Sequence, residues 1–168
     1  MRLFAAGVLT ALVLAAAPAT ALAAFTVTTT ADTYDATCDA QCSLRDAVSA
    51  ANAAAGDDVI TLPAGTYRLT RLGAQENANV TGDLDVTSVI TVEGAGAGTT
   101  VIDAVGADRV IEAASGALTM RDVTVTGGAL RITGPGCAPS DFEGAGIASR
   151  VDLVLKRGRV TGNRYARN

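Results

Sequence analysis

The chain has 168 residues and a formal charge of −4 at pH 7, from 13 basic and 17 acidic side chains. It contains no His and no Trp, which excludes His-based catalytic triads and His-ligated metal sites and argues against an aromatic stacking platform. The acidic balance has the wrong sign for neutralising a phosphate backbone, so we expect no nucleic-acid partner. This length is typical of a single domain.

The first 23 residues have the pattern of a secretory signal peptide. Arg2 precedes an uncharged run from Leu3 to Leu14, and small residues surround Pro18. The triplet Ala21-Leu22-Ala23 fits the A-x-A cleavage rule, so we expect cleavage near Ala23 and a secreted or cell-surface protein. An uncleaved membrane anchor is the alternative, but the apolar run is short and no stop-transfer flank follows. The chain is therefore expected to meet the membrane only through its signal.

Export makes the three cysteines interpretable. Cys38 and Cys42 are close in sequence, and a disulfide between them is the default expectation in an oxidising compartment. A metal site here is disfavoured because there is no second Cys pair and no His to complete it. Cys137 is left over: it is free, pairs between chains, or belongs with a partner in a missing segment.

One amphipathic helix is expected, over residues 44–54. Ser43 is followed three residues later by Asp46, which resembles a capping box. Apolar residues then recur at helical spacing, and Gly56 ends the pattern. We expect no other helix after the signal peptide.

The remaining chain predicts short strands, separated by Gly, Asn and Asp residues that allow sharp turns. A polar loop is expected from Gly73 to Gly82. The strands are expected near residues 25–27, 59–62, 67–69, 89–92, 100–102, 109–112, 118–120, 123–125, 130–132, 151–155 and 159–161.

These strand segments repeat. Three apolar residues of one segment have apolar counterparts 35 residues later in the chain. Two of the same three also have apolar counterparts 28 residues earlier. The matched sets are Leu118, Met120 and Val125 with Leu153, Leu155 and Val160, preceded by Ile90 and Val92. A varying offset with the apolar residues in step is typical of a solenoid whose loops differ in length. A β-sandwich could use the same strands.

A resemblance to a known family favours the solenoid. Cys42-Ser43-Leu44-Arg45-Asp46-Ala47 is followed by Ala51-Asn52 and by Asp58-Val59-Ile60-Thr61-Leu62-Pro63-Ala64-Gly65-Thr66-Tyr67. These segments resemble the CSLREA domain of secreted bacterial proteins, which reads C-S-L-R-E-A, a helix ending in A-N, and D-T-I-x-L-P-x-G-x-Y. The chain departs from that pattern at Asp46, where the family usually has Glu, a change expected to weaken the helix cap slightly.

The resemblance implies an all-β fold: a short right-handed parallel β-helix of the pectin-lyase-like superfamily with one N-terminal capping α-helix. Residues 1–23 would be the signal peptide, 24–72 the CSLREA-like cap and 73–168 the β-helix coils. A helix tied down by a disulfide would cover the strand edge exposed at the first coil, with Leu44 and Val48 facing it. Nothing comparable follows Asn163, so we expect the chain to be truncated at its C-terminus.

The pectin-lyase-like superfamily includes sugar-cleaving enzymes, but no catalytic site is recognised in this sequence. The polygalacturonase-like N-T-D, G-H-G and R-I-K motifs are absent. The pair Asp57-Asp58 is expected in a turn after the helix. Asp83 and Asp85 would lie on one side of a strand and are candidate Ca²⁺ ligands, with Arg109 or Arg121 as a nearby cation. A loop without metal is the alternative, and no other cofactor is expected.

Two further features have ordinary interpretations. The carboxylates of Asp32, Asp35 and Asp39 surround the expected disulfide, and we expect them to be solvated. Asn79-Val80-Thr81 matches a glycosylation sequon, which predicts a surface loop there.

Together these features predict an exported β-helix protein that presents an extended surface for extracellular binding or adhesion, with a polysaccharide or cell-surface glycan as partner. The first alternative is a polysaccharide lyase or glycoside hydrolase of the pectin-lyase-like superfamily. The second is a non-functional fragment of a longer surface protein. The sequence gives no oligomeric state.

Overall fold

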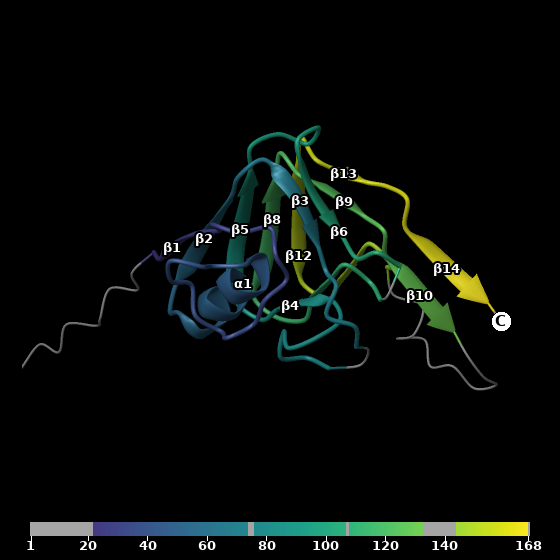
Figure 1. Cartoon of the computed structure of the whole chain (residues 1–168), viewed down its shortest axis with the longest axis horizontal. Coiled ribbons are helices and arrows are strands. Elements are labelled where there is room, and N and C mark those ends of the chain that lie inside the picture. The colour runs from purple at the N-terminus through teal and green to yellow at the C-terminus, as the bar shows by residue number, and fades with distance from the viewer. Residues whose placement is uncertain (1–21, 74–75, 107, 133–143, 168) are drawn as a thin grey trace, which may run out of the picture.

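The computed structural model describes residues 22–73, 76–106, 108–132 and 144–167 (Figure 1). In this part the chain forms one helix, α1 (Leu44–Ala53), and parallel β-sheets. The strands are β1 (Ala24–Thr26), β2 (Asp57–Leu62), β3 (Gly65–Arg68), β4 (Leu84–Val86), β5 (Val89–Gly94), β6 (Thr100–Asp103), β7 (Ile111–Ala113), β8 (Ala117–Arg121), β9 (Thr124–Thr126), β10 (Ala129–Ile132), β11 (Ile147–Ser149), β12 (Asp152–Lys156), β13 (Arg159–Val160) and β14 (Arg164–Arg167).

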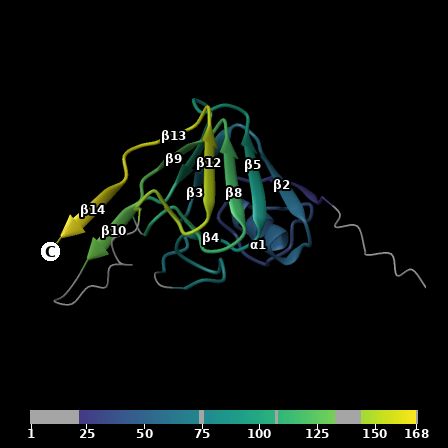
Figure 2. The same cartoon turned by 180° about the vertical axis from the view of Figure 1, so that it is seen from behind.

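The strands are distributed over the sheets in a repeating order. The largest sheet has the order β1-β2-β5-β8-β12, a second has β3-β6-β9-β13, and a third has β4-β7-β11. From β2 to β7, the chain visits these three sheets in turn twice, and β8 and β9 begin a third round. Strand β10, which pairs with β14 in a separate two-stranded sheet, then precedes β11 of the third sheet. Figure 2 shows β2, β5, β8 and β12 side by side in the largest sheet. The parallel, largely β character expected from the sequence is therefore confirmed.

The strand register is the one that the sequence repeats predict. Leu118 pairs with Leu153 and Met120 with Leu155 across β8 and β12. The offset of 28 residues also corresponds to strand pairing, because Ile90 pairs with Leu118 across β5 and β8. Residues one place apart point to opposite faces of a strand, so this register keeps each apolar column on one face of the sheet.

The core lies between the three sheets. Ile60, Ile102 and Met120 are at most 1% exposed. Columns of such residues run from strand to strand, as in the second sheet, where Tyr67 pairs with Ile102 and Ile102 with Val125. Stacking aliphatic residues in this way buries the inner face of each strand against its neighbours.

Helix α1 packs its apolar side on the N-terminal strands. Leu44, Ala47, Val48 and Ala51 are buried, and the helix contacts β1, β2, β4 and β5. The helix was expected to extend to Ala54, but Ala54 is the C-cap and has an extended backbone. Figure 1 shows α1 beside β1 and β2, at the far end of the largest sheet from β12.

Several local expectations were wrong. Asp57 and Asp58 begin strand β2 instead of forming a turn. Strand β11 was not predicted, and β4 was indicated only by the spacing of Asp83 and Asp85. The segment after Asn163 forms β14, which pairs with β10. Cys137 and most of the expected signal peptide lie outside the described residues, and no described helix has the length and apolarity needed to cross a membrane.

Candidate functional site

Three buried carboxylates come together on the third sheet. Asp85 of β4 and Glu112 of β7 are register partners, and Asp83 lies just before β4. Oxygens of these three side chains lie within 4.8 Å of one another. Like charges directly opposite on adjacent strands repel, so this carboxylate cluster needs compensation from its surroundings.

Arg109 supplies part of that compensation. Its Nε lies 3.1 Å from Asp83 Oδ2, and its Nη1 lies 3.3 Å from Glu112 Oε2. Neither Arg109 Nε nor Asp83 Oδ2 has a hydrogen-bond partner of good geometry, so their attraction is mainly that of two nearby charges. Arg150 Nη2 lies 3.6 Å from the other carboxylate oxygen of Glu112, Oε1. The proximity of Asp83, Asp85 and Arg109 agrees with the expectation from the sequence, which did not include Glu112.

Arg121, the other arginine expected as a cation near Asp83 and Asp85, does not contact the carboxylate cluster. It is on β8 and its Nη1 donates to Glu93 Oε1 at 2.7 Å. Asp108 is an additional acidic neighbour of the carboxylate cluster, and it is only 7% exposed. Its Oδ1 accepts a hydrogen bond from the Arg109 backbone N–H at 2.8 Å.

Burial makes the carboxylate cluster bind protons near neutral pH. Desolvation is the largest cause that raises the pKa of Asp83 to about 7, and the charges of Asp108 and Asp85 add to it. Desolvation also raises the pKa of Asp85 to about 6, against the backbone hydrogen bond from Asn79. The pKa of Asp108 is raised for the same first reason. The arrangement can therefore hold a proton at Asp83.

The same oxygens could instead hold a hard cation, because Ca²⁺ takes carboxylate and carbonyl oxygens. Asp83, Asp85 and Glu112 provide three carboxylates within reach of one ion. Arg109 already contacts two of these three groups. A cation would have to share them with this arginine or displace it, so the proton and the Arg109 guanidinium are the simpler means of neutralisation.

The loop before β4 covers the carboxylate cluster. Asn79 Oδ1 accepts from the Asp85 N–H at 2.7 Å, and Asn79 Nδ2 donates to the Asp85 carbonyl at 2.9 Å. Asn79 is 2% exposed and has a positive φ of 60°. The sequon was expected to mark a surface loop, which is wrong for Asn79 itself, because its amide nitrogen is buried and engaged.

Arg45 ties the capping helix to this loop, a role that was not expected from the sequence. Its Nη1 donates to the carbonyls of Asn79 and Asp83, and its Nη2 donates to the Gly82 carbonyl at 2.8 Å. Its Nε lies 2.8 Å from Asp32 Oδ1, and both side chains are almost wholly buried. The expectation that Asp32 is solvated is therefore wrong: burial of the Arg45 charge requires a buried counter-ion.

The start of the helix is fixed as its sequence suggested. Ser43 Oγ accepts from the Asp46 N–H at 3.0 Å, and Asp46 Oδ2 accepts from the Ser43 N–H at 3.3 Å, which completes a capping box. Burial raises the pKa of Asp46, but the hydrogen bonds from Ser43, Asp35 and Ala36 outweigh it and lower the pKa overall. The disulfide between Cys38 and Cys42 is present just before the cap.

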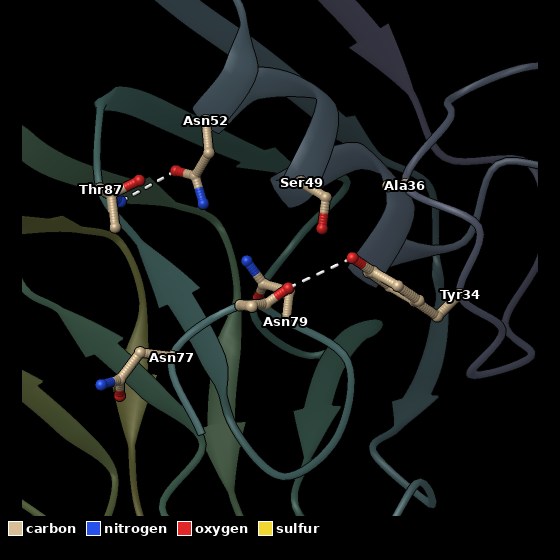
Figure 3. Close-up of a pocket in the computed structure, with 8 residues that line it drawn as sticks. Tyr34, Ala36, Ser49, Asn52, Asn77, Asn79 and Thr87 are labelled. Atoms are coloured by element: carbon tan, nitrogen blue, oxygen red, sulfur yellow. Dashed lines mark hydrogen bonds between the residues drawn. The ribbon is translucent and has the colours of Figure 1, made fainter. Parts of the chain in front are cut away.

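A cavity of about 250 Å³ lies between the helix and the β3–β4 loop (Figure 3). Its lining is about equally polar and apolar, and its polar side chains include Tyr34, Ser49, Asn52 and Thr87. Asn52 is engaged structurally, because its Nδ2 donates to the Asp85 carbonyl and its Oδ1 accepts from the Thr87 N–H. Ser49 Oγ has no partner. The cavity has polar groups and room for water, but these residues do not form an acid–base pair.

No protein-family model, no curated protein and no solved structure matches this chain.

Proposed function

We propose that this protein is an exported, CSLREA-type, right-handed parallel β-helix that binds a polysaccharide or cell-surface glycan. The observation that carries the architecture is the repeated visit of the chain to three parallel sheets in a fixed order. A sandwich of antiparallel strands would not give all-parallel pairing. Helix α1 then serves as the cap of the first coil, since it contacts strands of two sheets.

The outer face of the largest sheet is the surface proposed for binding. Thr61, Glu93, Arg121 and Lys156 form one column of register partners on this face, and Val59, Thr91, Thr119 and Val154 form the next. Their spacing follows the ladder, about 4.8 Å from strand to strand. The polar members of this regularly spaced face offer donors and acceptors along an extended ligand, as a glycan chain would require, and the two valines add apolar contacts.

Burial disfavours the lyase or hydrolase alternative. The acidic residues that gather with an arginine are Asp83, Asp85 and Glu112, and each is at most 9% exposed. A general acid or base must come within hydrogen-bond reach of its substrate. A polymer could reach these carboxylates only if the loop held by Asn79 and Arg45 moved away.

The proposal is tested by binding of the purified protein to immobilised polysaccharides, with polygalacturonate among them. We expect retention without release of unsaturated or reducing ends, with or without Ca²⁺. Thr119→Glu, at the centre of the proposed face, should abolish retention. Thr66→Glu, an exposed position of β3 in the second sheet, should retain it. Product formation that depends on Asp83 or Asp85 would favour the enzyme instead.

A further inference from the structure

The last strand of the largest sheet, β12, has an open outer edge. Its other edge pairs with β8, and among the described residues no strand pairs with its outer edge. Leu153 and Leu155 are each 39% exposed. Their register partners on β8, Leu118 and Met120, are fully buried in the core. The core side of β12 is thus an apolar surface without a cover, of the kind that marks an interaction site.

The backbone of this edge is ready to pair. The Lys156 carbonyl accepts from the Asp122 N–H, on the side of β8. Because backbone groups alternate in direction along a strand, those of Leu153 and Leu155 point the other way, toward the open edge. An open edge with unpaired N–H and C=O groups is a template for another strand.

We propose that β12 pairs with β12 of a second copy of this chain, antiparallel, about a two-fold axis through Val154. The sequence of the strand is Asp152-Leu153-Val154-Leu155-Lys156, which is self-complementary in this arrangement. Each Asp152 lies opposite Lys156 of the other copy, and each Leu153 lies opposite Leu155. Opposite charges and apolar residues directly across an antiparallel pair are favourable.

The hydrogen-bond pattern fits the same axis. Leu153 and Leu155 of the two copies form the hydrogen-bonded pairs, because their backbone groups face the open edge, and the two Val154 residues form the non-hydrogen-bonded pair between them. Rotation about an axis normal to the sheet keeps inward side chains inward. Leu153 and Leu155 of both copies therefore continue one core across the interface.

The N-terminal end of the fold also favours a two-fold dimer over head-to-tail pairing. Helix α1 packs on β1 and β2 with Leu44 and Val48 buried, so the N-terminal end does not present a matching apolar surface to β12. Tail-to-tail pairing uses the same patch twice and closes, whereas head-to-tail pairing would produce open filaments. The inference uses the sheets as observed and stands whether or not the proposed glycan binding is correct.

The first test is the oligomeric state by sedimentation equilibrium. We expect a dimer. Lys156→Asp places two acidic residues opposite each other at both ends of the pair and should raise the dimer dissociation constant about tenfold or more. The double variant Asp152→Lys, Lys156→Asp exchanges the charges and should restore the dimer. A monomer of the unchanged protein, a larger polymer, or a failure of the double variant to recover would overturn the proposal.

The second test places the axis. In a Cys137→Ser background, Val154→Cys should form an intermolecular disulfide on mild oxidation, because a non-hydrogen-bonded pair brings the two Cα atoms to about 4.5 Å. Thr119→Cys, the register partner one strand inward, is the matched control and should remain monomeric on denaturing gels. Equal cross-linking of both variants, or none at Val154→Cys, would contradict the two-fold pairing.

Discussion

Arg45 and Asp32 form a buried ion pair, with Arg45 Nε 2.8 Å from Asp32 Oδ1 and side-chain exposures of 0% and 2%. The same guanidinium donates to three carbonyls of the loop before β4. One side chain from α1 therefore holds both the segment before the helix and the loop that covers the carboxylate cluster.

Removing this charge should destabilise the protein strongly. Arg45→Met leaves Asp32 buried without its counter-ion and should lower the free energy of unfolding by about 3–5 kcal/mol. Arg68→Met is the matched control, since Arg68 is 67% exposed and lies 3.9 Å from Asp103; its cost should be at most about 1 kcal/mol. Urea unfolding curves measure both. Equal costs would contradict the role given to Arg45.

The disulfide should contribute less than this ion pair. It closes a loop between Cys38 and Cys42, at a sequence separation of 4, and the entropy of so short a loop corresponds to about 2 kcal/mol. Replacing both cysteines by Ser should lower the free energy of unfolding by that amount, as measured by thermal unfolding.

Mass spectrometry of the non-reduced protein should find Cys38 linked to Cys42 and a free thiol at Cys137. A link from Cys137 to either residue would contradict the pairing.

The carboxylate cluster predicts an unusual pH dependence. The folded-state pKa values of Asp83 and Asp85 are raised to about 7 and about 6, so the folded state binds more protons than the unfolded state between pH 4 and 7. Stability should therefore fall as pH rises through 6 and 7. Asp46, whose pKa is lowered, is ionised in both states at pH 6 to 7 and does not alter the slope there.

Asp83→Asn tests whether the carboxylate cluster causes this pH dependence, because it removes the carboxylate whose pKa is raised most. We expect the variant to lose most of the decline in melting temperature between pH 5 and 8, with Asp35→Asn, in the loop before the helix, as the control that keeps it. An unchanged slope in Asp83→Asn would show that another group takes up the proton.

Calcium provides an independent test of how the carboxylate cluster is neutralised. Arg109 already lies within 3.3 Å of both Asp83 and Glu112, so we expect the melting temperature at pH 7.5 to be the same in Ca²⁺ and in EDTA. A rise in Ca²⁺ that is lost in Asp85→Asn would show instead that the cluster holds a metal ion, since a ligand bound only to the folded state stabilises it.

Local patterns allowed the helix and the strand register to be predicted from sequence. Ser43 and Asp46 are three residues apart, and the capping box needs nothing more distant. The register followed from apolar repeats, because each coil must place its inward residues over those of the previous one, as Leu118 and Leu153 do.

The contacts of the carboxylate cluster could not be predicted in the same way. Glu112 lies in a segment that was expected to be a strand, but it meets Asp85 only through the pairing of β7 with β4, and no apolar repeat in the sequence indicates that pairing. Asp32 was expected to be solvated and no partner was expected for Arg45, because the burial of this pair depends on the fold of the β3–β4 loop. Loop geometry of this kind has no periodic signature in the sequence.

The central structural claim is that successive coils stack with parallel strands in this register. A disulfide engineered between Thr91→Cys and Thr119→Cys, register partners on β5 and β8, tests it most directly in a Cys137→Ser background. Adjacent strands lie about 4.8 Å apart, within the Cα–Cα range of a disulfide. The pair should close intramolecularly on oxidation, while Thr91→Cys with Arg159→Cys, on another sheet, should not. Failure of the first pair to close, with the protein still folded, would contradict the account.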